Sequence, residues 1–290
     1  MAIGALEAGG TKMVCAVFDE KANIISQQSF PTETPEKTLP ELARFFKNAG
    51  IDALGIGCFG PIDLDMSSPT YGYITSTPKK AWQNCDIVGT FKDALNVPVG
   101  FDTDVNGSAI GEHAFGIGRE VDNLVYITIG TGIGIGIIND GKIVHGGMHP
   151  EGGHIMLTKS KTDSFTSVCP FHESCFEGLC SGPAIEKRWG KKGYELADDA
   201  KVWELEAYYI AGALYSYTAI LSPQMMILGG GVMHQKQLFE LVRSEFKKCN
   251  NGYINNRYVD DPEKYIVCQS LDDKQGILGA FKLGMDAKYT

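Results

Sequence analysis

The sequence has no long apolar run, no excess of basic residues and no linker rich in Pro, Ser or Gly. No segment of the 290 residues approaches the roughly 18 consecutive apolar residues of a membrane span. The opening residues MAIGALEAGG show no basic region followed by an apolar stretch, so we expect no signal peptide, no membrane partner and a cytoplasmic protein. The formal net charge of −9 argues against a nucleic-acid partner bound by neutralising its phosphates.

The 8 cysteines lack the regular spacing of a disulfide framework. In a reducing compartment the scattered ones are expected to be free thiols. Two others fall with a histidine in the short run CPFHESC, from Cys169 to Cys175. The residues alone favour a metal site there over uncoordinated thiols, although the run does not have a standard zinc-finger spacing. The six scattered cysteines are Cys15, Cys58, Cys85, Cys180, Cys249 and Cys268.

Two glycine-rich turns, each placed between apolar strands, give the two halves of the chain a common pattern. The first is Gly9-Gly10-Thr11, which is followed by a strand over residues 13–18. The second follows a predicted strand over residues 124–129, where glycine alternates with Thr or Ile through Gly136. We therefore predict a two-lobed α/β protein with its active site in a cleft.

Glycines beside threonine suit phosphate binding, because backbone N–H groups and a hydroxyl can then approach phosphate oxygens. Neither common nucleotide motif is present. EAGGTK lacks the P-loop spacing, and IGTGIGIG leads into another strand, whereas the Rossmann fingerprint leads into a helix. Each turn alone is weak evidence, since glycines at a hairpin tip also serve ordinary turns. A third glycine run, at residues 229–231, is predicted to leave room for an adenosine beside the backbone.

A series of motifs in a fixed order resembles the sugar kinases of the ROK family (repressors, open reading frames and kinases), and most closely its bacterial fructokinases. The resemblance extends from residue 4 to about residue 285. It implies the actin-like ATPase (ribonuclease H-like) fold, with two duplicated α/β domains around a nucleotide cleft. We expect a small domain over residues 1–115 and a larger one over residues 116–290, with the C-terminal helix packing back on the first. The motifs are EAGGTK, GCFGPID, TDVNGSAIGE, IGTGIG, HPEGGH, CPFHESCFEG and LGGGV.

The resemblance implies phosphorylation of a hexose by ATP and Mg²⁺, with D-fructose converted to fructose 6-phosphate, by a homodimer. Glucokinase, mannokinase and N-acetylmannosamine kinase are alternatives, because all share the same carboxylates. A sugar-responsive repressor of the family is a second class of function. It is disfavoured, because the first phosphate strand begins at residue 4 and leaves no room for a helix-turn-helix.

Asp104 is the candidate general base for the sugar hydroxyl. It lies where a predicted strand becomes a helix, a position that also suits a plain N-cap aspartate, with Ala109, Ile110 and Ala114 facing inward. The surrounding TDVNGSAIGE resembles the catalytic motif of the family, and this resemblance favours the general base over a plain N-cap. Thr103 stands where the family often has Asn, a difference compatible with fructose.

The resemblance assigns the other site residues by motif. Glu7 stands where the family commonly has Asp and is expected to contact Mg²⁺ through water. Residues expected to bind the sugar are Gly60, Thr103, Asp104, Glu151, His154 and Glu177. Residues expected to bind ATP are Gly9, Gly10, Thr11, Lys12, Thr131, Gly132, Gly229, Gly230 and Gly231.

Four residues of the second half are expected to hold a structural Zn²⁺: His154, Cys169, His172 and Cys175. Four protein ligands complete a tetrahedral site and leave no open position, so the metal would fix the loop between Glu151 and Glu177. Cys180 is close enough in sequence to compete with Cys175 as a ligand. The histidines at 113, 145 and 149 are expected to be ordinary surface or loop residues.

Overall fold

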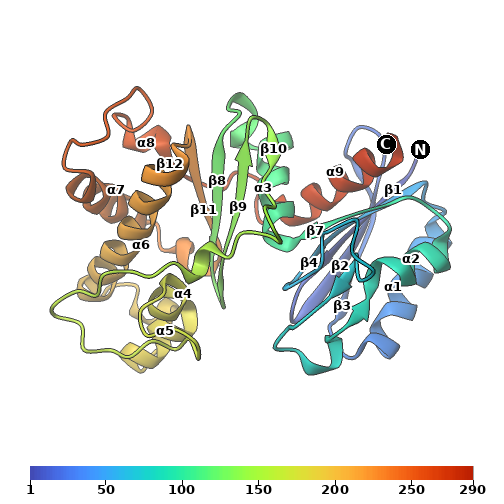
Figure 1. Ribbon diagram of the computed structural model, residues 1–290, viewed down its shortest axis with the longest axis horizontal. Helices are drawn as coiled ribbons and strands as arrows, with labels where there is room; N and C mark the ends of the chain where they lie inside the picture. Colours follow the sequence, from blue (N-terminus) through green and yellow to red (C-terminus); the bar gives the residue numbers. More distant parts are fainter. Residues whose placement is uncertain (290) are drawn as a thin grey trace. The chain divides into compact units, whose positions relative to one another are not determined.

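A computed structural model describes residues 1–289 of the chain (Figure 1). The chain divides into two compact units. Unit 1 comprises Met1–Arg119, Ile143–Pro150 and the segment from Ser270 onward. Unit 2 comprises Glu120–Lys142 and Glu151–Gln269. The two-domain boundary expected at residues 115 and 116 stays a prediction.

Unit 1 contains a five-stranded mixed sheet in the order β3-β2-β1-β4-β7. The three consecutive strands β1, β2 and β3 pair antiparallel, and the predicted hairpin around Gly9 and Gly10 is the β1–β2 connection. β4 and β7 extend the sheet in parallel on the other side of β1. The strands are β1 (Ile3–Ala8), β2 (Lys12–Phe18), β3 (Ile24–Pro31), β4 (Ala53–Cys58) and β7 (Val99–Thr103).

A second five-stranded sheet repeats this order as β10-β9-β8-β11-β12. The antiparallel β8–β9 pair corresponds to β1–β2, and β11 and β12 add in parallel as β4 and β7 do. The repeated topology confirms the predicted α/β duplication. The strands are β8 (Leu124–Ile129), β9 (Ile133–Asn139), β10 (Lys142–Ile143), β11 (Met225–Gly229) and β12 (Ile266–Cys268).

Alternate residues of the first sheet pack against two different layers, as the two-residue period of a strand requires. Ala5 and Val14 face the core that includes Ile277 and Phe281 of α9 (Gln275–Tyr289). The intervening residues, such as Leu6, face the core beneath α1 (Pro35–Ala49) and α2 (Ile87–Leu95). The C-terminal helix α9 therefore covers one face of the N-terminal sheet (Figure 1).

The remaining elements are short connections and the helices of unit 2. Helix α5 begins at Gly182 and ends at Trp189. Within residues 1–289, no helix combines the length and apolar character that a membrane crossing requires. These elements are β5 (Tyr73–Ile74), η1 (Lys80–Trp82), β6 (Cys85–Asp86), η2 (Ile117–Glu120), η3 (Gly152–His154), α4 (Phe176–Cys180), α5 (Gly182–Trp189), η4 (Gly193–Leu196), α6 (Ala200–Leu221), η5 (Gly231–His234), α7 (Gln237–Asn250) and α8 (Pro262–Tyr265).

Helix α3 (Asp104–Phe115) differs in two details from its prediction. Its N-cap is Thr103, whose hydroxyl accepts a hydrogen bond from the Asn106 N–H at 3.0 Å, so Asp104 is the first helical residue. Ala109 is buried as predicted, but Ile110 and Ala114 are only partly buried. Small and polar residues occupy the inward face instead, because another helix approaches very closely there.

That helix is α9, and the approach depends on glycine. A Cβ atom placed on Gly279 would lie 1.7 Å from the carbonyl oxygen of Gly107 in α3. A Cβ on Gly111 of α3 would lie 2.1 Å from the carbonyl oxygen of Gln275. Neither contact can relax by rotating a side chain, because backbone atoms stand on the opposite helix.

We expect Gly279→Ala to lower the free energy of unfolding by at least about 2 kcal/mol, because the added methyl group forces α3 and α9 apart. Gly212→Ala is the matched control. Gly212 lies inside α6, and a Cβ there would meet nothing within 4 Å. This control should instead stabilise the protein by about 0.5 to 1 kcal/mol, as helix propensity dictates. Urea denaturation of both variants measures the difference, and equal effects would contradict the close-packing argument.

Candidate functional site

The first glycine turn, between β1 and β2, is held tightly by β3 and the residue that follows it. The Thr32 hydroxyl donates to the Gly9 carbonyl at 2.7 Å, and the Thr32 N–H donates to the Thr11 carbonyl at 3.0 Å. A Cβ on Gly9 would lie 2.6 Å from the Lys12 carbonyl oxygen. The turn is therefore short and preorganised, and it presents exposed Thr11 and Lys12 at its edge.

The second glycine turn, between β8 and β9, lies at the wall of a cavity of about 580 Å³ inside unit 2. This volume falls within the range of small-molecule sites. The turn is fixed by a hydrogen bond from the Gly182 N–H to the Gly130 carbonyl at 2.7 Å. The lining includes two of the predicted residues, Thr131 and Gly231. It also includes residues that no motif indicated, namely Glu186, Lys192, Tyr194, Trp203, His234 and Gln235.

Two of the predicted nucleotide glycines have packing roles in the structure. A Cβ on Gly229 would lie 1.9 Å from the side-chain oxygen of Gln269. Gly230 has a φ of 88°, and a Cβ on it would lie 2.5 Å from the carbonyl oxygen of Ile129. Both glycines thus allow β11 to end close to β8, which brings the next residue, Gly231, to the cavity.

In unit 1, Asp104 stands at the first turn of α3, directly after β7. Its Oδ1 accepts a hydrogen bond from the Val105 N–H at 2.8 Å. Glu7 lies on β1, and its pKa is raised from 4.5 to about 7. Burial is the largest cause, followed by the charge of Asp104, while Lys12 opposes the shift and Asp273 adds to it. Carboxylates thus gather here despite their repulsion, which is typical of functional sites.

Gly60 lies in the turn after β4, beside His149. A Cβ on Gly60 would lie 3.5 Å from the ring of His149. His149 is buried, and the Ile62 N–H is 3.4 Å from its Nε2. His149 thus lies in a loop, one of the two places expected for it, but it is buried rather than on the surface. The neighbouring His145 is partly exposed, and its Nε2 lies 2.7 Å from Oδ2 of Asp102.

In unit 2, Glu177 on α4 contacts the backbone beside the second glycine turn. Its Oε2 accepts a hydrogen bond from the Ile133 N–H at 2.9 Å, and its Oε1 lies 3.9 Å from Nε2 of His154. The segment with His154 is fixed by close packing, since a Cβ on Gly153 would lie 1.8 Å from the Ile133 carbonyl oxygen. Glu151, exposed, directly precedes this segment.

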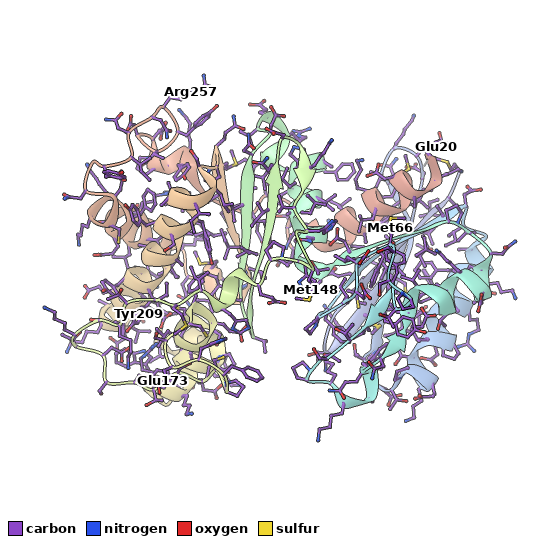
Figure 2. The ribbon with its side chains drawn as sticks, in the orientation of Figure 1. Glu20, Met66, Met148, Glu173, Tyr209 and Arg257 are labelled. Atoms are coloured by element: carbon purple, nitrogen blue, oxygen red, sulfur yellow. The ribbon has the colours of Figure 1, made fainter. Side chains whose placement is uncertain are left out.

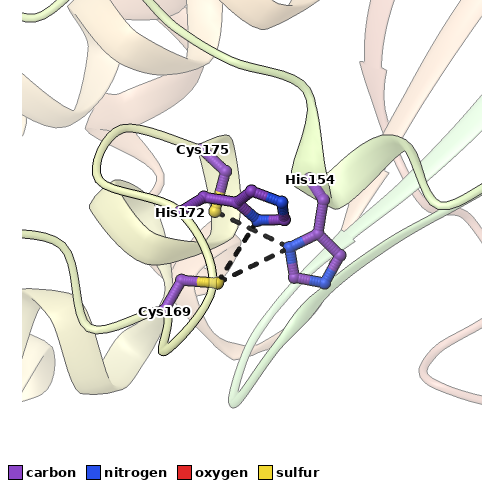
Figure 3. A group of neighbouring side chains, drawn as sticks. All are labelled: His154, Cys169, His172 and Cys175. Carbon is purple, nitrogen blue, oxygen red and sulfur yellow. Dashed lines mark hydrogen bonds between the residues drawn. The ribbon is translucent and has the colours of Figure 1, made fainter.

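The four predicted zinc ligands, His154, Cys169, His172 and Cys175, form a group whose ligand atoms lie within 4.8 Å of one another (Figure 3). Nδ1 of His154 is 3.6 Å from the Cys175 sulfur and 4.0 Å from the Cys169 sulfur. Nδ1 of His172 is 3.5 Å from the Cys169 sulfur. Zinc bonds of about 2.1 Å to nitrogen and 2.3 Å to sulfur at tetrahedral angles require a separation of about 3.6 Å. These three separations are close to that value, so the four side chains could hold one metal ion.

Cys180 lies outside this group. It is fully buried, with a thiol pKa raised well above 9.0 by burial and then by the charge of Glu206 on α6. Glu206 in turn accepts a hydrogen bond from Arg188 at 2.8 Å. Arg188 also pairs with Asp163, to which Tyr209, labelled in Figure 2, donates a hydrogen bond at 2.7 Å. These buried charges fix the chain just before the metal-ligand loop.

The chain matches the ROK family over residues 3–287, and it belongs to that family. Fructokinase of Pediococcus pentosaceus is 43% identical over 287 residues, 99% of each chain. Fructokinase of Streptococcus mutans is 45% identical over 274 residues, 92% of each chain. The crystal structure of ROK hexokinase from Thermus thermophilus matches with a TM-score of 0.81 at 26% identity and covers all of both chains. The predicted family and its actin-like ATPase fold are confirmed.

The raised pKa of Glu7 predicts a stability that depends on pH. A carboxyl whose folded-state pKa is raised favours the folded state below its unfolded pKa of about 4.5, and this stabilisation is lost as pH rises through about 7. Glu7→Gln should therefore match the wild type near pH 5 and become more stable near pH 8.5, by up to about 3 kcal/mol. Urea denaturation in EDTA measures both. A difference that is equal at the two pH values would contradict the assignment.

Proposed function

We propose that the protein is an ATP-dependent sugar kinase that converts D-fructose to fructose 6-phosphate. The observation that carries the proposal is 43% identity to a fructokinase over 99% of both chains. The site supports it, because both sheets place a glycine turn between antiparallel strands, and such turns bind phosphate through backbone N–H groups. Glucokinase, mannokinase and N-acetylmannosamine kinase activities remain the alternatives within the same chemistry.

The cavity of unit 2 suits the adenosine of ATP. Trp203 and Tyr194 give it flat apolar walls, and Gly231 allows the backbone to approach the ligand. Thr131 offers a hydroxyl and Gly132 an N–H at its turn, and the turn of unit 1 offers similar groups to the phosphates. The residues of that turn are Gly9, Gly10, Thr11 and Lys12, of which Lys12 adds a positive charge.

Asp104 would act as the general base that orients and deprotonates the attacking sugar hydroxyl. Mg²⁺ bound with ATP would neutralise charge on the transferring phosphate. Glu7 fits such a cation through water, because its carboxyl is a hard oxygen donor whose repulsion by Asp104 and Asp273 a divalent cation would relieve. The carboxyl is therefore kept next to the base despite its cost to stability.

Sugar hydroxyls call for acceptors that can take more than one hydrogen bond. Glu151, His154 and Glu177 offer such groups from unit 2. In unit 1, the Gly60 backbone and the Thr103 hydroxyl are the candidates. The Thr103 oxygen already accepts from Asn106, and its own proton remains available to donate to a sugar oxygen.

We assign the Cys and His group to a structural Zn²⁺, because two thiolates and two imidazoles at tetrahedral spacing match that ion. The metal would hold the loop that leads into α4 and thereby the carboxylate of Glu177. The expected homodimer stays a prediction that sedimentation can check.

We expect purified protein with MgATP to release ADP faster with fructose than with glucose, mannose or N-acetylmannosamine in a coupled assay. Asp104→Asn, purified in the same way, should lose about 10²- to 10⁴-fold in kcat, because the general base is gone while the side-chain shape remains. Retained binding of ATP would show that this variant is folded. Better turnover of another sugar would contradict fructose specificity, and near-normal turnover by the variant would remove Asp104 from the mechanism.

Elemental analysis should find one zinc ion per chain in the wild type. Cys175→Ser should lose the metal and raise the KM for fructose more than the KM for ATP, because the freed loop must be ordered at each sugar-binding event. Cys180→Ser is the matched control, since Cys180 lies beside Glu206, and it should keep the zinc. Wild-type protein that is free of metal and fully active would contradict the site.

A further inference from the structure

Asp102, at the end of β7, is a buried carboxylate that holds the first turn of α3. Its side chain is only 2% exposed. Oδ1 accepts hydrogen bonds from the Thr103 N–H at 2.8 Å and from the Asn106 side-chain amide at 2.7 Å. These bonds flank Asp104, the proposed base. A carboxylate this deeply buried also needs an opposite charge close by.

That charge comes from His145, whose Nε2 lies 2.7 Å from Oδ2 of Asp102. His145 belongs to the segment Ile143–Pro150, which is part of unit 1 although the chain on both sides of it belongs to unit 2. Gly146, Gly147 and Met148 of this segment are exposed, with Met148 labelled in Figure 2, so they bury little surface against unit 1. Besides His145, the buried His149 contacts unit 1 from this segment, with its Nε2 3.4 Å from the Ile62 N–H.

We propose that the Asp102–His145 pair is a proton-dependent anchor that positions both the proposed base Asp104 and the segment leading to the proposed sugar ligand Glu151. Glu151 is the next residue after Pro150, so the anchor restrains where the sugar-binding stretch begins. Asp102 and His145 are both positioning residues, because they act on the reaction only through Asp104 and Glu151. The inference rests on the proposed kinase function and deepens it, since it makes fructose affinity depend on pH.

The charges around the pair favour a protonated imidazole. The hydrogen bond to Asp102 is the largest cause that raises the pKa of His145 above 6.5, and burial opposes it. In the loop before β5, burial raises the pKa of the Tyr71 phenol, and the charge of Asp102 adds to the shift. The charge of Asp104 instead acts on Glu7.

The sign of the pH effect follows from the raised pKa of His145. The stabilisation from the charged pair is fully present below the unfolded histidine pKa of about 6.5, and it is lost as pH rises through the higher folded-state value. A neutral imidazole retains a weaker hydrogen bond, because charge-assisted bonds are about twice as strong as neutral ones.

The direct experiment is an NMR titration of the histidine ring protons in the full chain without ligands. The chain has 6 histidines, and His145→Gln identifies the signal of interest by its loss. We expect His145 to titrate above about 6.5 in the wild type and to move back toward that value in Asp102→Asn. A wild-type His145 that titrates at or below about 6.5 overturns the proposal.

The kinetic experiment compares wild type, His145→Gln and the control His113→Gln, which changes a histidine on α3 away from the pair. Glutamine at 145 keeps a hydrogen-bond donor but has no charge. Near pH 6.5 we expect His145→Gln to raise the KM for fructose about fivefold and to lower kcat as well, because Asp104 is less well positioned, with the KM for ATP unchanged. The KM difference should disappear at a pH well above the His145 pKa that the NMR titration gives, where the wild-type imidazole is neutral.

A merely structural role would give a KM ratio that does not change with pH, and that result overturns the proposal. Glu7 titrates in the wild type and in His145→Gln alike, so its effect cancels in the ratio of their KM values for fructose. The control should match the wild type at every pH. If another hexose proves to be the substrate, the proposed fructose specificity fails, while the NMR titration and the same kinetic ratio, measured with that hexose, still decide the anchor.

Discussion

The contact between α3 and α9 is the packing constraint on which unit 1 depends. Glycines at 107, 111 and 279 bring the two backbones within a distance that no side chain permits. Because α9 lies at the C-terminal end of the chain, this contact attaches the last segment to the first sheet. It also brings Gly276 of α9 against the carboxyl of Glu7, and α3 itself begins with Asp104. Two catalytic candidates are thus positioned by one tight helix crossing.

Unit 1 places its carboxylates at a cost to folding. Glu7 is kept close enough to Asp104 for its pKa to reach about 7, and Asp102 is buried two residues before the base. Packing alone would favour neutral residues at these positions. Such an arrangement is expected where a cation and a sugar hydroxyl, rather than the folded state itself, are the partners of the charges.

The sequence was sufficient to predict what local patterns and family motifs encode. The hairpin around Gly9 and the strand over residues 124–129 follow from period and turn residues, and the structure confirms them. The Cys and His group also came from a short motif, and the structure brings its members together. The burial of His149 and the partner of His145 were missed, because both contacts join segments more than 40 residues apart. No local pattern reports which distant backbone or carboxylate a loop histidine will meet, and the same is true of Lys192 and Tyr194 at the cavity.

Within unit 2, Glu177 connects three features that the sequence presents separately. One carboxylate oxygen accepts a hydrogen bond from the backbone that follows the second glycine turn, and the other faces Nε2 of His154. The opposite ring nitrogen of His154 faces the cysteine sulfurs of the metal group. A metal ion on Nδ1 would fix the ring and its tautomer, and the ring would then present an Nε2–H to the carboxylate. Metal loss would therefore reach Glu177 through a single imidazole, so the proposed ion would act on the proposed sugar ligand rather than on the glycine turn of unit 1.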